Sequence, residues 1–207
     1  MSVRQGLLAL LADAPMHAYQ LRHEFEQRTG GTWPLNMGQV STTLDRLVRD
    51  ELVAPLDVDA DDVVRYHLTH TGRAELERWW TTAVVRSAPA RDELSIKLAL
   101  AVSAPGVDVC VIVQTQRTET MRALRDLTRL KADLPASGWT REDLAWSLVL
   151  DHLIFAAEAE VRWLDHVEAR VARATDKGIV LAPRAASGEL PPAEQAAREH
   201  VADGGAR

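Results

Sequence analysis

The sequence predicts a mainly α-helical protein, in which a small N-terminal domain containing two strands precedes a C-terminal domain of long helices. Apolar residues recur at the helical period through most of the chain. Two short runs rich in β-branched residues interrupt that period between residues 52 and 69. The last periodic segment, from Arg141 to about Ala174, is long enough for about five heptads.

Length and composition limit the number of domains. With 207 residues, 46% of them apolar and 26% charged, the chain has room for one to two globular domains. We expect domains at 1–85 and 86–176, followed by a flexible tail at 177–207 that is rich in proline and glycine. No signal peptide or membrane span is expected, and a single cysteine, Cys110, suits the cytoplasm. Cys110 is predicted to be a small core residue, with a redox sensor as the alternative.

The chain opens with two short helices. Residues 3–12 are a Leu- and Ala-rich run that Pro15 separates from the next element. A second helix is predicted from about His17 to Arg28, and Gly30 and Gly31 end it.

The third helix, at 36–50, has two unlike faces. Val40, Leu44 and Leu47 form an apolar stripe at i, i+4 and i+7. Asn36 and Gln39 match a capping box at its start. The opposite face carries amide, hydroxyl and guanidinium groups, which are the types that read base edges and grip phosphates. An ordinary solvated surface helix is the alternative.

Strand-like runs follow at 52–56 and 63–69, with a hairpin tip between them, and Thr71 is predicted to cap the next helix. The order helix, helix, helix, strand, turn, strand, helix is that of a winged helix-turn-helix, whose third helix enters the major groove of DNA.

The N-terminal part resembles the PadR-type transcriptional regulators over roughly residues 3–80. The matching segments are LLALL (7–11), PMHAYQL (15–21), WPLN (33–36), GQV (38–40), TLDRL (43–47), LV (52–53) and YHLTHTGR (66–73). The resemblance implies a homodimeric regulator, usually a repressor, with a C-terminal helical dimerisation domain like that of the larger subgroup. It also raises the option of a small planar effector, because relatives respond to phenolic acids or flat drugs.

The candidate DNA-binding residues form two sets. Gln39, Thr42, Thr43 and Arg46 are predicted to face the groove, and Ser41, Arg49, Arg65 and Tyr19 are secondary candidates for phosphates. Position 41 departs from the family pattern, since many relatives carry a tyrosine there that helps hold the DNA backbone.

The predicted wing tip is acidic. It contains Asp57, Asp59, Asp61 and Asp62, and Arg65 is the nearest cation. Because carboxylates repel phosphates, we expect the tip to be turned away from DNA or loosely engaged. Aspartate is also simply a good turn residue. A metal site is the remaining alternative, although the spacing matches no calcium loop.

Beyond the wing the chain is helical. One or two helices are expected at 71–103, with a break at Ala88-Pro89, and longer helices at 107–134 and 141–174. The last helix has residues that approximate a seam with steps of three and four: Ala145, Leu148, His152, Phe155, Ala159, Trp163 and His166. Packing with a second copy would bury it, and an intramolecular three-helix packing is the alternative.

The sequence contains no phosphate-binding loop, dinucleotide glycine fingerprint or nucleophile elbow, so no enzyme activity or cofactor is expected. His152 and His166 are expected to be satisfied interfacial histidines, with a metal site across the dimer as the alternative. Four tryptophans could line an aromatic effector pocket, or could simply pack in the core: Trp79, Trp80, Trp146 and Trp163. Two rival functions stay open. One is a protein-interaction adaptor that kept the fold and lost its DNA, and the other is a ligand carrier or enzyme built on the tryptophan-rich helices.

The charge balance yields a prediction. Residues 1–70 hold six Lys or Arg against ten Asp or Glu, a net charge of −4. Phosphate neutralisation supplies most non-specific affinity for DNA, so we expect weak non-specific binding and a shallow dependence of affinity on salt. A salt titration of DNA affinity measures this, and a steep slope equivalent to about ten phosphate contacts per dimer would contradict it.

Overall fold

The computed structural model describes residues 2–56, 63–85 and 91–178. The predicted acidic wing tip (Asp57, Asp59, Asp61, Asp62), the Ala88-Pro89 break and the tail lie outside these residues. The chain divides into two compact units, one made of Met1–Ser87 with Asp126–Phe155, the other of Ala88–Arg125 with Ala156–Arg207. The domain boundaries at 85 and 176 stay predictions.

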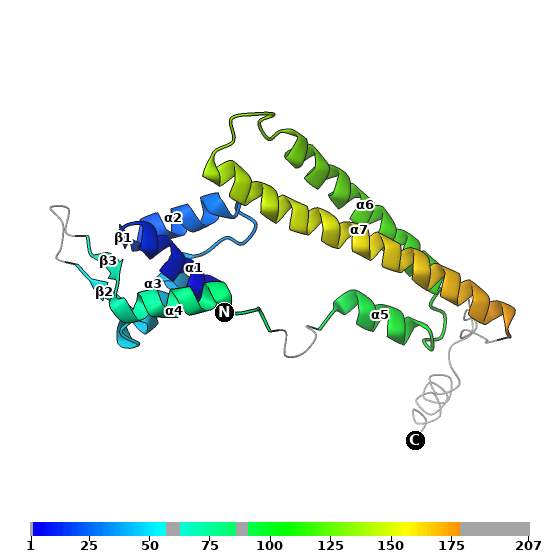
Figure 1. Ribbon diagram of the computed structural model, residues 1–207. Coiled ribbons are helices and arrows are strands. Elements are labelled where there is room, and N and C mark those ends of the chain that lie inside the picture. Colours follow the sequence, from blue (N-terminus) through cyan, green and yellow to red (C-terminus); the bar gives the residue numbers. More distant parts are fainter. Residues whose placement is uncertain (1, 57–62, 86–90, 179–207) are drawn as a thin grey trace, which may run out of the picture. The chain divides into compact units, whose positions relative to one another are not determined.

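The N-terminal elements form the winged helix-turn-helix that the sequence predicts (Figure 1). Their order is α1 (Ser2–Asp13), β1 (Met16–His17), α2 (Ala18–Arg28), α3 (Met37–Arg49), β2 (Val53–Pro55), β3 (Arg65–Leu68) and α4 (His70–Thr81). β3 lies in the middle of a three-stranded antiparallel sheet of order β1-β3-β2. Tyr66 therefore pairs with Met16 on one side and with Pro55 on the other.

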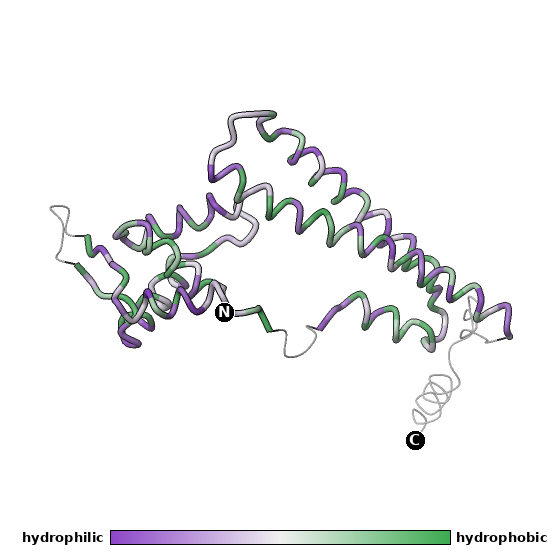
Figure 2. Tube along the Cα trace, in the orientation of Figure 1, coloured by the Kyte–Doolittle hydropathy of each residue, from purple (hydrophilic) through white to green (hydrophobic). Residues whose placement is uncertain are grey.

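One apolar core joins these elements. α1 supplies the buried leucines at its centre, and Figure 2 shows the same stretch as strongly hydrophobic. The core members are Leu7, Leu8, Leu10, Leu11, Leu21, Phe25, Leu35, Val40, Leu44, Leu47, Leu52, Val53, Leu68 and Leu76. Every helix of the N-terminal domain contributes at least one of them, so the position of α3 is set by apolar contact with the rest of the domain.

Two helix starts differ from the sequence prediction. His17 is the N-cap of α2 rather than its first residue, and it shares a capping box with Gln20 while pairing with Arg65 in β1. The cap of α4 is Thr69, not Thr71: its hydroxyl accepts from the N–H of Gly72 at 2.9 Å. The prediction of Thr71 was wrong because the helix begins two residues earlier.

The helices after α4 are α5 (Glu93–Ala101), α6 (Val109–Ala132) and α7 (Arg141–Asp176). Thr140 caps the start of α7, since the N–H of Asp143 donates to its hydroxyl at 3.1 Å. A second core cluster contains Leu98, Ala101, Val109, Val113 and Leu164. Figure 2 shows hydrophilic and hydrophobic residues alternating along α6 and α7, as expected of helices with one packed face.

Charged contacts join α6 to α7 within the second unit. One guanidinium nitrogen of Arg117 lies 2.9 Å from Asp165 and 2.6 Å from Glu168. Arg117 donates to Glu168 and lowers the pKa of that carboxyl below its ordinary value. The same pair raises the pKa of Arg117, so both groups are charged at neutral pH.

The predicted seam on α7 is mostly open. Leu148 and Phe155 are 63% and 66% exposed, and His152, Ala159 and His166 are exposed as well. Trp163 differs, because it is partly buried against the second core cluster. The fully buried residues of α7 are instead Leu150 and Leu164, which belong to a different face.

Cys110 is exposed, so the prediction that it is a core residue was wrong. Its neighbours Val109 and Val113 face the second core cluster, and the helical period turns Cys110 away from it. None of the described helices is long and apolar enough to cross a membrane.

Gly72 provides a test of the packing. A Cβ placed there would lie 1.9 Å from the carbonyl oxygen of Leu52, which is backbone and cannot rotate away. We expect Gly72→Ala to lower the free energy of unfolding by about 3 kcal/mol, in the upper range for overpacking. Urea denaturation measures this against Arg73→Ala at an exposed neighbour. Equal stability of the two variants would contradict the close approach.

Candidate nucleic-acid interface

α3 presents the two faces that its sequence predicts. Val40, Leu44 and Leu47 are at most 1% exposed and point into the N-terminal core. Gln39, Thr42 and Arg46 on the other side are exposed. Thr43 is half-buried and lies at the border of the polar face.

Local hydrogen bonds fix the start of α3. The N–H of Gln39 donates to Oδ1 of Asn36 at 2.8 Å, and the N–H of Asn36 donates back to Oε1 of Gln39 at 3.0 Å. The predicted capping box is thus confirmed. Since the box uses only the oxygen of the Gln39 amide, its Nε2 group still has donors for a base acceptor. The hydroxyl of Thr43 donates to the Gln39 carbonyl at 2.6 Å.

A surface hollow of about 490 Å³ lies along this face. It brings together all four predicted groove-facing residues, and its lining is Val3, Asn36, Gly38, Gln39, Thr42, Thr43 and Arg46. Val3 is the contribution of α1. The concentration of polar side chains in the first half of the helix suits a recognition helix, whose N-terminal residues contact base edges.

The secondary phosphate candidates lie on three elements. Ser41 is exposed on α3, and Arg65 is exposed on β3. Tyr19 is 58% exposed in the first turn of α2, where the guanidinium of Arg22 lies 5.3 Å from its ring centroid. The sequence prediction did not include Arg22, although its i, i+3 spacing from Tyr19 is a usable signal.

Arg49 is the candidate whose surroundings differ most from expectation. Its Nε and Nη2 both donate to Oδ1 of Asp50, at 3.2 and 3.1 Å. Asp50 also binds Arg4 of α1, at 3.2 Å. The sequence prediction missed this contact, because residues 46 positions apart leave no local pattern. By contrast, Arg46 makes no ion pair within the part of the chain that the structure describes.

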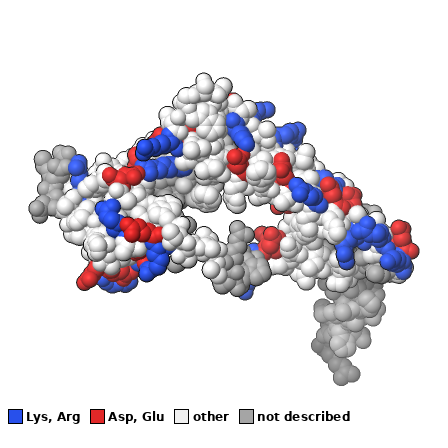
Figure 3. All heavy atoms as spheres, in the orientation of Figure 1, with Lys and Arg blue, Asp and Glu red and all other residues white. Residues whose placement is uncertain are grey.

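The surface charge is mixed. Figure 3 shows basic and acidic side chains next to one another over the N-terminal elements. Among the described residues, no group of three or more His, Cys, Asp and Glu is placed to hold a metal ion.

The four candidate effector tryptophans lie in different surroundings. Trp79 packs against the N-terminal core, and its ring centroid lies 4.3 Å from that of the exposed Trp80. Trp146 covers Gly30, where an added Cβ would meet its ring at 2.1 Å. Trp163 packs against the second core cluster. The aromatic pocket stays a prediction.

Two family models cover most of the chain. The model of the PadR-like transcriptional regulator family matches residues 7–78, and the model of the C-terminal part of virulence activator alpha matches residues 90–172. The N-terminal domain, residues 7–78, therefore belongs to the PadR-like family of transcriptional regulators. The family is a class of DNA-binding regulators and not a class of enzymes.

Solved structures show the same fold. PadR of Bacillus subtilis in complex with operator DNA is 20% identical, with a TM-score of 0.62 over 83% of this chain and 99% of that one. The same protein in complex with p-coumaric acid is 21% identical, with a TM-score of 0.65 over 83% of this chain and 99% of that one. The Vibrio cholerae virulence activator AphA is 20% identical, with a TM-score of 0.63 over 83% of this chain and 98% of that one. No curated protein sequence matches the chain.

Proposed function

We propose that this PadR-family regulator acts as a repressor, binding a pseudo-palindromic operator as a homodimer through two copies of α3. The observation that carries the proposal is the hollow in which Gln39, Thr42, Thr43 and Arg46 meet on the exposed face of α3. These side chains offer the amide, hydroxyl and guanidinium groups that pair with base edges. The Bacillus subtilis relative in complex with operator DNA supports the same mode of action.

The open face of α7 supports the homodimer. Leu148 and Phe155 place large apolar side chains in solvent on one face of a 36-residue helix, with His152 between them. Burying such a face against a second copy removes apolar area from water, and a two-fold axis presents two copies of α3. The two helices would then lie about 34 Å apart, or a multiple of it, to reach one face of DNA.

A small planar effector would release the repressor. The relative in complex with p-coumaric acid supports this, and Trp79, Trp80, Trp146 and Trp163 remain the candidate residues. The signal would act by changing the separation of the two α3 helices.

The net charge of −4 in residues 1–70 favours a second candidate, a winged-helix adaptor that binds proteins instead of DNA. Genome-wide recovery of bound fragments, followed by band shifts with the recovered sequences, separates the two. A regulator yields a two-fold symmetric motif, whereas an adaptor yields no enriched sequence.

Arg46→Ala tests the placement of α3. We expect it to weaken operator binding by about 1–3 kcal/mol and to relax selectivity at one base pair in each half-site, because one base contact per protomer is lost. Titrations with operators changed at single positions measure both effects. The matched control is Arg73→Ala, an exposed arginine of α4. Unchanged footprints and selectivity for Arg46→Ala would contradict the placement.

Phe155→Asp tests the homodimer. We expect the variant to be monomeric at concentrations where the wild type is dimeric, because a charge at the centre of an apolar interface costs about 2 kcal/mol or more. Light scattering with size-exclusion chromatography measures the mass. Ala172→Asp adds the same charge at an exposed position on another face of α7. A dimeric Phe155→Asp variant would exclude this face as the interface.

A further inference from the structure

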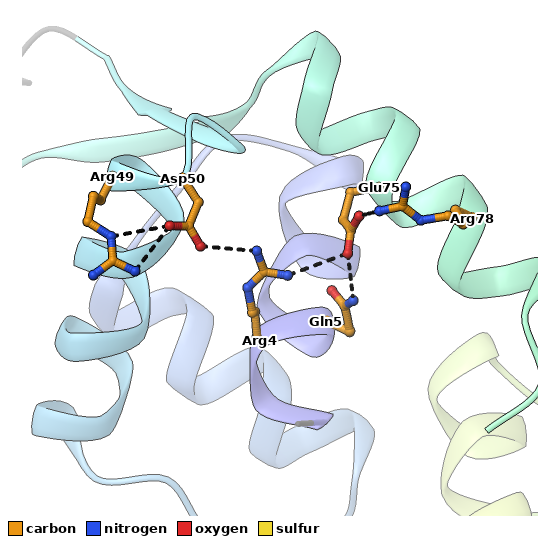
Figure 4. A network of polar contacts seen from close by, with 6 residues as sticks. All are labelled: Arg4, Gln5, Arg49, Asp50, Glu75 and Arg78. Atoms are coloured by element: carbon orange, nitrogen blue, oxygen red, sulfur yellow. Dashed lines mark hydrogen bonds and ion pairs between the residues drawn. The ribbon is translucent and has the colours of Figure 1, made fainter. Parts of the chain in front are cut away.

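We propose that Asp50 competes with DNA phosphate for Arg49, so that the protein's own carboxylate limits the backbone contacts of α3. The proposal rests on the DNA-binding function and adds a residue that sets the balance between specific and non-specific binding. Figure 4 shows the network that carries it.

Arg49 is placed to face DNA. It is the last residue of α3, seven residues after Thr42 and three after Arg46, so all three lie on one side of the helix. Its side chain is 73% exposed. An arginine at this position would be expected to reach a phosphate beside the groove.

The carboxylate of Asp50 already occupies that guanidinium. Nε and Nη2 of Arg49 both donate to Oδ1 of Asp50, at 3.2 and 3.1 Å. Both donors on this edge of the guanidinium converge on one carboxylate oxygen, and a phosphate oxygen would compete for the same edge. A phosphate must therefore displace Asp50 from Arg49 or accept a negative charge close beside it.

Asp50 is held in place from the other side. Nη2 of Arg4 lies 3.2 Å from Oδ2 of Asp50, and Nη1 of Arg4 lies 3.5 Å from Oε1 of Glu75 in α4. Glu75 in turn accepts from Gln5 at 3.3 Å and pairs with Arg78. These contacts with α1 and α4 hold the carboxylate of Asp50 while the more exposed Arg49 side chain has freedom to move.

The negative charge on Asp50 does not stabilise α3. Asp50 is the C-cap residue of α3, where the partial negative charge of the helix end disfavours a carboxylate. Its hydrogen bond from Arg49 is the largest cause that lowers the pKa of Asp50, and Arg4 adds to it. The group is therefore ionised at neutral pH and competes as a full charge.

The experiment uses the full chain and a DNA duplex of about 30 base pairs with random sequence. We expect Asp50→Asn to bind this duplex more tightly, with a slope of log affinity against log salt that is steeper by about 0.9 per bound protomer. A fourfold rise in salt then weakens the variant about 3.5-fold more per protomer than the wild type. Arg49→Gln alone should lower the slope by less than one full phosphate contact, because Asp50 already holds this guanidinium. Arg49→Gln in the Asp50→Asn background should abolish the gain.

Asp45→Asn is the matched control, because it removes an exposed carboxylate from the same helix without touching the pair. An equal gain from Asp45→Asn, or a gain that persists in the double variant, would show a general charge effect and overturn the proposal.

Unfolding in urea measures whether Asp50→Asn lowers the stability of the domain because the ion pair with Arg4 is lost. Should that variant not fold, Arg49→Gln decides alone, and loss of one phosphate contact per protomer in it overturns the proposal. A failure of every folded variant and the wild type to bind any duplex overturns the DNA-binding function as well.

Discussion

The burial of one face of α3 is the constraint on which the interface depends. Val40, Leu44 and Leu47 are almost completely buried, and truncating a buried leucine costs about 2–5 kcal/mol. A rotation of α3 by one residue, about 100°, would expose this stripe and bury polar groups instead. The outward direction of Thr42 and Arg46 is therefore fixed by apolar packing inside the domain before any DNA is present.

Most of the fold could be predicted because its signals are local. The α3 stripe, its capping box and the Thr140 cap each depend on residues within one or two helical turns. Two of the misses have long-range causes. β1 is only two residues long and exists because Met16 pairs with Tyr66, fifty positions away. In the candidate site, the contact between Arg4 and Asp50 is equally invisible in the sequence, and it decides the surroundings of Arg49.

α7 carries two apolar stripes, whereas the sequence prediction assigned one. Leu150 and Leu164, fourteen residues apart, lie on the face that is buried within the chain. Leu148 and Phe155 lie on a second face that the chain itself leaves in water. In the proposed homodimer, a helix with two such faces would join one subunit to the other, and a change in α7 would alter the spacing of the two α3 helices.

Ion pairs within the N-terminal domain connect its net negative charge with its arginines. Arg49 is paired with Asp50, Arg4 is shared between two carboxylates, and Arg28 lies 2.8 Å from Asp13. Arginines that are paired in this way neutralise carboxylates of the protein and have fewer free donors and less net charge for binding phosphate. Arg46, in the hollow, has no such partner among the described residues. Under the proposed competition, electrostatic attraction to any duplex would be restrained, and discrimination would shift toward contacts that only the correct bases can satisfy.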